Sequence, residues 1–362
     1  MLPIRRFAGA VAAFALLVTL AYAGLAGIGG WTGDGGAALA QTAGTVPGNT
    51  LGSSSDAEIW RAIRQGQQGT VSIQDEMAGI LIQSEGDNWR AWRNGPLSLY
   101  GAWAMLGVIA VLALFFLIRG RIRIDAGPSG RLIERFNSPE RFAHWLLATS
   151  FIILALTGLN LMYGRYVILP VIGPELFSTL TQLGKYAHNY VGFAFMLALV
   201  MILVLWIRHN IPNRHDMVWL AKAGGMLKKG VHPPAKKFNA GQKILFWLIL
   251  LGGASISVSG IALMFPFEFE MFAGTFAVLN IFGFGLPTEL TPIQEMQYSQ
   301  LWHALMGLFL IAVVIGHIYI GTIGMEGAFD AMGSGKVDSN WAKEHHSLWA
   351  AEAKPSESGG DD

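Results

Sequence analysis

The sequence predicts an all-α integral membrane helix bundle, and three observations carry that prediction. Hydrophobic residues make up 52% of the 362 residues and charged residues only 14%, whereas soluble domains carry about 25% charged residues. Five long runs with almost no charge are each long enough to cross the roughly 30 Å hydrocarbon core as a helix. Basic residues gather in alternate loops between these runs, as in membrane proteins oriented by positive charge. The net charge of +1 argues against a nucleic-acid partner.

Residues 1–40 have the features of a targeting segment. The basic pair Arg5 and Arg6 precedes an uncharged run and small residues suited to cleavage. The uncharged run is longer than the about 7–15 residues typical of a signal peptide, so a cleaved signal peptide and an uncleaved signal anchor both remain open. Either one predicts that the polar region 41–96, with a short helix around 56–64, is periplasmic.

The apolar runs predict one extra transmembrane helix at 97–118, followed by a membrane domain at 119–331 that holds a four-helix core. The loops after the first and third runs carry six and eight basic residues, and the two opposite loops carry two and none. The positive-inside rule therefore places the basic loops and the polar tail, 332–362, in the cytoplasm of a bacterium with the chain in its inner membrane. The apolar segment 271–286 is too short to span and is expected at the outer interface. The five runs are 97–118, 142–163, 186–207, 244–265 and 301–323.

The chain contains no cysteine. This excludes an iron–sulfur cluster, a thiolate zinc site, a disulfide and a covalently attached haem on this chain. Any metal must therefore be held by histidines or carboxylates.

Four histidines lie inside the runs, where an ionisable residue is a functional candidate. His303 and His317 are fourteen residues apart on the last run, which puts them on nearly one helix face and about 21 Å apart in depth. Because zinc ligands lie about 2 Å from one ion, a single four-histidine zinc site is excluded. Depth instead pairs His188 with His303 near the outer face and His144 with His317 near the inner face. Two imidazoles at each of two depths predict two six-coordinate haems b; ordinary interhelical hydrogen bonds are the alternative.

Three glycines fit this prediction. Gly192 and Gly307 each follow an expected ligand by four residues, and Gly158 follows His144 by fourteen residues, which places it at the depth of the outer haem. A missing side chain on these faces leaves room for a flat macrocycle. The alternative is close helix packing, which also favours small residues in membranes.

Two basic residues are candidates for binding haem propionates. Arg141 and Lys185 each precede an expected ligand by three residues and so share its helix face. For Arg141 the alternative is an ordinary positive-inside residue.

The stretch 144–338 resembles the cytochrome b subunit of membrane-bound, quinone-linked formate dehydrogenases. The matching segments are ERFAHW, ALTG, KYAHNYVGF, RHNIPNRHDMVWL, KFNAGQKILFW, LWHALMGLFLIAVVIGHIYI and GKVDSNWAKEHHSLW. A four-helix pattern with these histidines is shared with hydrogenase cytochromes, whereas HNIP and NAGQK are more typical of the formate enzymes. The signal segment, the region 41–96 and the insertion around 271–292 depart from shorter family members.

The resemblance implies two haems b and a quinone site at the cytoplasmic haem. The residues that match the haem ligands are His144, His188, His303 and His317. The residues that match the quinone site are Asn239, Ala240, Gly241 and Gln242, beside His317. From the residues alone, the amides of Asn239 and Gln242 can hydrogen-bond a quinone carbonyl, and a helix N-cap at Asn239 is the alternative.

The sequence thus predicts an electron-transfer subunit that does not itself oxidise formate. The resemblance implies a periplasmic iron–sulfur beta subunit and a molybdenum- or tungsten-pterin catalytic alpha subunit as partners, with electrons passing through both haems to quinone. One alternative is the cytochrome b subunit of a nickel–iron hydrogenase or another periplasmic dehydrogenase. Another is a haem-free, histidine-bearing transporter, against which stands the absence of acidic residues from the five runs.

Overall fold

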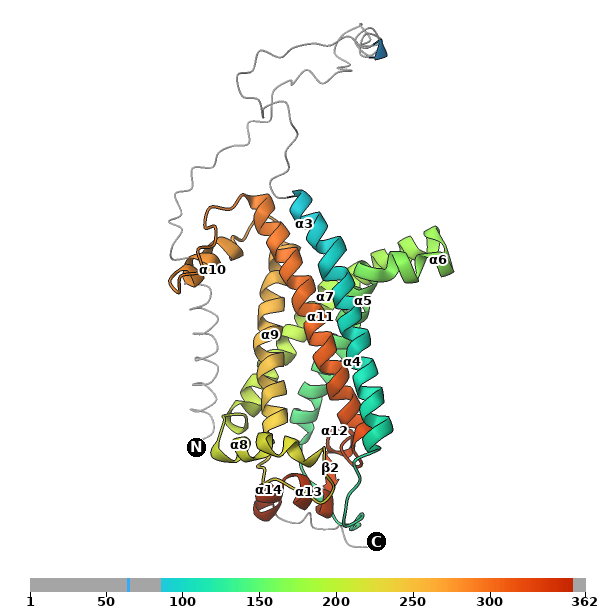
Figure 1. Cartoon of the computed structure of the whole chain (residues 1–362), viewed down its shortest axis with the longest axis vertical. Coiled ribbons are helices and arrows are strands. Elements are labelled where there is room, and N and C mark those ends of the chain that lie inside the picture. The colour runs from blue at the N-terminus through green and yellow to red at the C-terminus, as the bar shows by residue number, and fades with distance from the viewer. Residues whose placement is uncertain (1–63, 66–85, 354–362) are drawn as a thin grey trace.

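A computed structural model describes residues 64–65 and 86–353 of the chain, and its core is a bundle of long helices (Figure 1). The expected signal segment at 1–40, and all but the last residue of the expected helix at 56–64, lie outside the described residues.

Five helices in the described part are long and apolar enough to cross a membrane, which confirms the predicted fold class. In the first of them, α3 (Gly86–Trp92) and a π-helical turn lead directly into α4. The described helices extend beyond the apolar runs because polar residues cap and lengthen their ends. The other long elements are α4 (Ser98–Arg119), α5 (Ser138–Val167), α7 (Pro174–Trp206), α9 (Ala240–Met264) and α11 (Pro292–Tyr319).

Three of these helices begin at a capping box, in which two side chains satisfy each other's free backbone N–H groups. Because an uncapped helix start leaves N–H donors without partners, these short polar motifs decide where the apolar helices begin. The boxes are formed by Asn137 with Glu140 on α5, Asn239 with Gln242 on α9, and Thr291 with Gln294 on α11.

The long helices pack as two pairs, α5 with α7 and α9 with α11, while α4 lies against α11. Two adjacent glycines let α9 approach both of its neighbours. A Cβ at Gly252 would lie 2.9 Å from a methyl carbon of Leu310 on α11, and one at Gly253 would lie 3.0 Å from Leu199 on α7. Such close approach through small residues is how membrane helices gain packing contacts.

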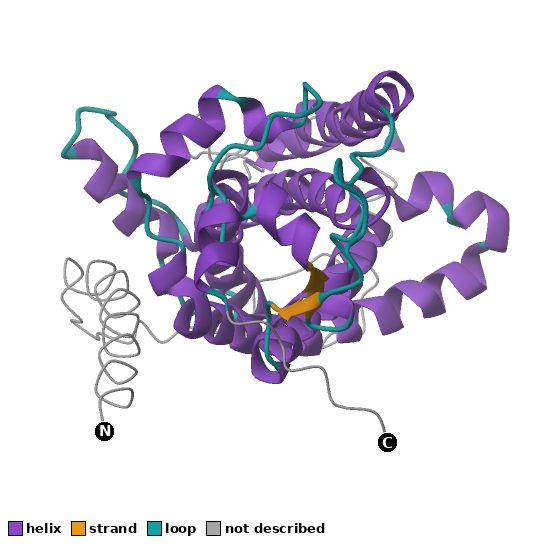
Figure 2. Ribbon diagram, turned by 90° about the horizontal axis from the view of Figure 1, so that it is seen from below, coloured by secondary structure: helices purple, strands orange, loops and turns teal. Residues whose placement is uncertain are grey.

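The polar tail expected at 332–362, for which the sequence predicted no elements, contains regular structure as far as residue 353. After α12 (Asp330–Gly333), the chain forms β2 (Lys336–Asp338), α13 (Ser339–His345) and α14 (Ser347–Glu352); these last three elements are called the C-terminal cap below. β2 pairs antiparallel with β1 (Leu132–Glu134), and Figure 2 looks onto this end of the bundle, where both strands lie. The tail folds because its few apolar residues, among them Val337 and Trp341, are buried.

The shorter helices lie at the two ends of the bundle. The apolar segment expected at 271–286 forms α10 (Met271–Asn280), at the end opposite the C-terminal cap (Figure 1). The buried carboxylate of Glu295 accepts hydrogen bonds from the backbone N–H groups of Phe272 and Ala273, both at 2.7 Å. The remaining short α-helices are α6 (Leu169–Ile172) and α8 (Arg214–Ala221).

Candidate functional site: two histidine pairs

The structure brings the four membrane histidines together in the two pairs that depth predicts. In the outer pair, His188 of α7 faces His303 of α11 with ring centres 6.1 Å apart and planes at 64°. In the inner pair, His144 of α5 faces His317 of α11 with ring centres again 6.1 Å apart and planes at 68°. The single helix α11 therefore serves both sites, one near each end of the bundle.

The separation within each pair fits one metal ion between two imidazoles. A metal–imidazole bond is about 2 Å long and the ring centre lies about 1 Å behind the nitrogen, so trans ligands have centres roughly 6 Å apart. The imidazoles of a pair do not hydrogen-bond each other in the described part of the chain. These residues fit the axial ligand set of a haem b at each depth.

A hydroxyl on a neighbouring helix holds His188 of the outer pair. The Nδ1 atom of His188 lies 2.8 Å from Oγ1 of Thr157 on α5, and that hydroxyl donates its own hydrogen to the carbonyl of Ile153 at 2.7 Å. With the hydroxyl hydrogen on that carbonyl, only its lone pairs face the imidazole. In this arrangement Nδ1–H of His188 donates, towards Oγ1 of Thr157 and the backbone carbonyl of Leu154. The tautomer this network assigns leaves the Nε2 lone pair available to a metal.

His303 of the outer pair is held in the same way. Its Nδ1 lies 3.0 Å from Oγ of the fully buried Ser259 on α9, which donates to the carbonyl of Ile256 at 2.9 Å. Nε2 of His303 is therefore also left as a lone-pair donor. Sequence reasoning missed both hydroxyls, although Thr157 lies in the quoted ALTG segment.

Within the described residues, no hydroxyl hydrogen-bonds an imidazole of the inner pair. Nδ1 of His144 is buried without a hydrogen-bond partner in the described part of the chain. The helix turn that carries His144 is instead tied to the segment before the C-terminal cap. Trp145 donates from Nε1 to the carbonyl of Met332 at 3.0 Å, and Arg141 donates to the carbonyls of Met332 and Gly333.

The predicted glycines lie beside the pairs in different ways. A Cβ at Gly158 would lie 3.5 Å from Cε1 of His188, so this glycine is at the outer depth as predicted, and a Cβ at Gly192 would meet nothing within 4 Å. A Cβ at Gly307 would lie 3.5 Å from Ile256. The open space at Gly192 fits a flat ring. Sequence reasoning missed Gly260, where a Cβ would lie 3.2 Å from Cε1 of His303.

The two predicted propionate partners differ in their surroundings. Lys185 is exposed on α7. Arg141 already donates from Nε and Nη2 to backbone carbonyls. Their role towards a haem stays a prediction.

The four residues predicted to bind quinone form the start of α9. Asn239 accepts a hydrogen bond from the backbone N–H of Gln242 at 2.9 Å, and Oε1 of Gln242 accepts from the N–H of Asn239 at 3.1 Å. Asn239 therefore has the N-cap role considered as the alternative. The amide NH₂ group of Gln242 makes no hydrogen bond within the described part of the chain. Ala240 is buried, and Gly241 lies under the ring of Trp219, to which a Cβ would come within 2.8 Å.

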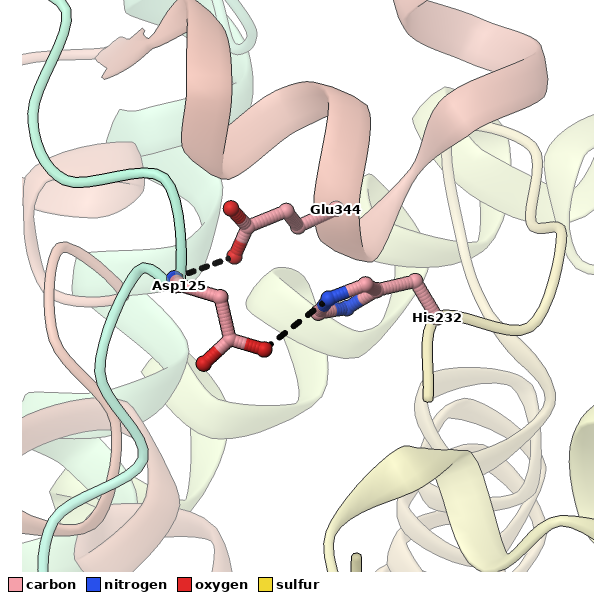
Figure 3. A group of neighbouring side chains, drawn as sticks. All are labelled: Asp125, His232 and Glu344. Carbon is pink, nitrogen blue, oxygen red and sulfur yellow. Dashed lines mark hydrogen bonds and ion pairs between the residues drawn. The ribbon is translucent and has the colours of Figure 1, made fainter. Parts of the chain in front are cut away.

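A second group of polar side chains lies under the inner end of the bundle (Figure 3). Nε2 of His232 lies 3.1 Å from a carboxylate oxygen of Asp125. Both oxygens of Glu344 accept backbone N–H groups, those of Asp125 and Ala126, each at 2.9 Å. Because Glu344 on α13 accepts these backbone hydrogen bonds, the group holds the C-terminal cap against the loop after α4. Its members are more than 100 residues apart in sequence, so no local motif could have revealed it.

A buried cation and a buried imidazole lie next to this group of polar side chains. Nδ1 of His346 donates to the carbonyl of Lys236 at 2.8 Å, so its Nε2 accepts from Nη2 of Arg135 at 3.0 Å. Burial, and then the charge of Arg135, hold the pKa of His346 well below its usual value. Burial lowers the pKa of Arg135 to about 9, although Glu140 opposes that change. Burial also lowers the pKa of the adjacent His345 to about 4.

Comparison with known proteins places this geometry in a family. The family described as prokaryotic cytochrome b561 matches residues 135–335, more than half of the chain. The nitrate-inducible formate dehydrogenase cytochrome b556(Fdn) subunit of Escherichia coli K12 is 30% identical over 229 residues, covering 63% of this chain and 94% of that protein. The formate dehydrogenase cytochrome b556(fdo) subunit of the same organism is 26% identical, over 61% of this chain and 93% of that protein. The formate dehydrogenase cytochrome b556 subunit of Haemophilus influenzae is 27% identical, over 64% and 87%.

The matched region contains all four paired histidines and four of the five long helices. The chain is therefore a multi-pass membrane cytochrome b of the prokaryotic cytochrome b561 family, of the kind represented by the cytochrome b subunits of formate dehydrogenases.

Proposed function

We propose that this chain is the cytochrome b subunit of a respiratory formate dehydrogenase and carries electrons across the membrane to quinone. The observation that supports this most directly is the pair of histidine sites at two depths, each with ring centres 6.1 Å apart. Two sites at different depths suit the passage of electrons through the membrane, whereas a single site would not connect the two membrane faces.

The four histidines would be the axial ligands of two haems b, His188 and His303 for the outer haem and His144 and His317 for the inner one. When bound, each haem supplies a carrier that takes up and gives up one electron at a time. The chain's own residues hold the two imidazoles of each site facing each other and keep the sites within the apolar bundle, away from water. The helices α5, α7 and α11 fix the distance between the two sites.

The direction of transfer follows from the charge of the loops. The basic loops and the C-terminal cap are assigned to the cytoplasm by the positive-inside rule, so the outer pair faces the periplasm. An electron that moves inward against an inside-negative potential costs about 2.3 kcal/mol per 100 mV. With protons for quinone taken from the cytoplasm, this work is stored as proton-motive force.

The quinone would be reduced near the start of α9. The capping box uses the carbonyl oxygen of Gln242, and its NH₂ group remains as the hydrogen-bond donor for a quinone carbonyl. Asn239 would support the site by capping α9, with Ala240 and Gly241 forming its floor under Trp219. His317, as the ligand of the inner haem at the same end of α11, would link the quinone to the electron path.

The partners of this chain are inferred from its relatives, which are named as subunits of formate dehydrogenases. A chain without cysteine cannot hold an iron–sulfur cluster. Electrons would therefore come from an iron–sulfur beta subunit, supplied by a molybdenum- or tungsten-pterin alpha subunit that oxidises formate.

Rapid mixing of membranes that contain the intact complex tests this proposal. Formate should reduce both haems, as seen in their absorbance, and a soluble quinone analogue should then reoxidise them. Reduction by hydrogen and not by formate would identify a hydrogenase cytochrome instead. An absence of haem absorbance from the purified chain would contradict the proposal as a whole.

A further inference from the structure

Two membrane helices carry the same dipeptide, a hydroxyl residue followed by glycine, each beside a histidine of the outer pair. A Cβ at the first glycine would lie 3.5 Å from Cε1 of His188, and one at the second would lie 3.2 Å from Cε1 of His303. A Cβ at Gly260 would crowd the imidazole of His303, whereas one at Gly158 would make an ordinary contact with His188. Both glycines mark the close approach of an imidazole to the helix that carries the hydroxyl. The dipeptides are Thr157 with Gly158 on α5 and Ser259 with Gly260 on α9.

The hydroxyls do more than bond to their own helix. Hydroxyl residues in helices commonly donate to a carbonyl one turn back, as Thr149 does on α5 and Ser257 does on α9. Only Thr157 and Ser259, among the hydroxyls on these two helices, also contact an imidazole nitrogen, at 2.8 and 3.0 Å. With the hydroxyl hydrogens on these carbonyls, the hydroxyl lone pairs face the imidazole Nδ1–H groups. The backbone carbonyls of Leu154 and Ile256 are further acceptors beside the two imidazoles.

We propose that Thr157 and Ser259 are positioning residues that fix the Nδ1–H tautomer of both outer ligands and lower the midpoint potential of the outer haem. An acceptor on Nδ1–H makes a ligating imidazole more basic. A more basic ligand stabilises ferric over ferrous iron, so the reduced form becomes harder to populate. Hydrogen bonds of this kind are among the means by which a protein tunes a haem.

The inner pair has no such hydroxyl–imidazole contact in the described part of the chain. Nδ1 of His144 has no hydrogen-bond partner in the described part of the chain, and no hydroxyl there contacts His317. The difference sets the outer haem at a lower potential than the inner haem. Electrons that enter at the outer side then move downhill towards the quinone. This inference rests on the proposed function, since it takes His188 and His303 as haem ligands.

A redox titration of the complex in membranes, followed at the haem absorbance bands, tests the inference without relying on turnover. Thr157→Val keeps the side-chain shape and removes the acceptor, and Ser259→Ala does the same on the other ligand. Each should raise the midpoint potential of the outer component, seen as a several-fold higher reduced fraction at a fixed poise. The inner component should not move. Thr157→Ser, which restores a hydroxyl, should return the outer component to its original potential.

Thr149→Val and Ser257→Ala are the matched controls, because they remove hydroxyls from the same helices that contact no histidine. An unchanged outer potential in both Thr157→Val and Ser259→Ala, with two haems retained, would overturn the inference. So would an equal rise in the control variants, or an equal rise of both components. Retention of the outer component in His188→Ala would instead contradict the proposed ligand assignment. If Thr157→Val does not assemble, Ser259→Ala and Thr157→Ser decide the question.

Discussion

Hydroxyls from neighbouring helices hydrogen-bond both imidazoles of the outer pair. In the inner pair, by contrast, the helix turn that carries His144 is hydrogen-bonded to a sequence-distant segment. The two pairs share the same separation of ring centres, so the difference lies in what orients them. The two hydroxyls that contact the outer pair both lie on helices of the bundle. The turn that carries His144 also depends on carbonyls of Met332 and Gly333, just before the C-terminal cap.

This contrast teaches that contacts between membrane helices hold one site, whereas contacts with a segment outside these helices hold the turn that carries His144 in the other. Changes within the membrane helices should act on the outer site. Changes that loosen the C-terminal cap should act on the inner site. The predictions below test whether the two sites separate in this way.

The largest effect is expected from removing a ligand. His188→Ala or His303→Ala should abolish the outer redox component and leave the inner one, while His144→Ala or His317→Ala should do the reverse. The reason is that each proposed haem would lose one of the two imidazoles that hold it. Redox titration of the membranes measures this. Loss of the same component in the His144 and His303 variants would show that the pairs are wrongly assigned.

Acid should loosen the C-terminal cap. The pKa of buried His345 is about 4, below its ordinary value of 6.5. At a pH between these two values, His345 therefore binds a proton when the cap is released from the bundle but not when it is docked. Stability therefore falls as the pH drops from 6.5 towards 4, by up to about 3 kcal/mol for this group.

Amide hydrogen exchange of the cap peptides at pH 7 and pH 5 measures this effect. Exchange should become faster in α13 and α14 beyond its intrinsic pH dependence, and α9 serves as the internal control. The absorbance of the inner haem should change before that of the outer haem. Equal protection of the cap at both pH values would contradict the prediction.

A smaller effect is expected at the predicted quinone site. Gln242→Glu keeps a side-chain oxygen in the position of the amide Oε1 that caps α9 and removes the NH₂ donor. A neutral hydrogen bond contributes roughly 0.5–1.5 kcal/mol, so reoxidation of the haems by a quinone analogue should slow several-fold. Reduction by formate and the haem content should stay unchanged. Stopped-flow absorbance gives both rates, and normal reoxidation would remove Gln242 from the site.

The membrane helices and the histidine pairs were predictable because both depend on simple periodic signals. Long apolar runs specify spanning helices, and the fourteen-residue interval from His303 to His317 specifies two depths on one face. The hydroxyl contacts of Thr157 and Ser259 were not predictable in the same way, since they depend on how neighbouring helices are rotated against each other.

The folded elements of the polar tail, the C-terminal cap, were not predictable for a similar reason. Its composition is polar, but Val337 and Trp341 are buried against distant elements and Glu344 binds backbone donors over 200 residues away. A hydropathy pattern carries no information about such long-range partners. The capping role of Asn239 was open from the sequence because an N-cap and a ligand-binding amide use the same residue type.

The central claim is that each histidine pair holds one haem b, and the haem content of the purified chain tests it most directly. A pyridine haemochrome assay, referred to the amount of chain by amino-acid analysis, should give two haems b per chain. The native protein should also give a low-spin spectrum, because each proposed haem iron would bind two imidazoles. One haem per chain, or none, would contradict the account.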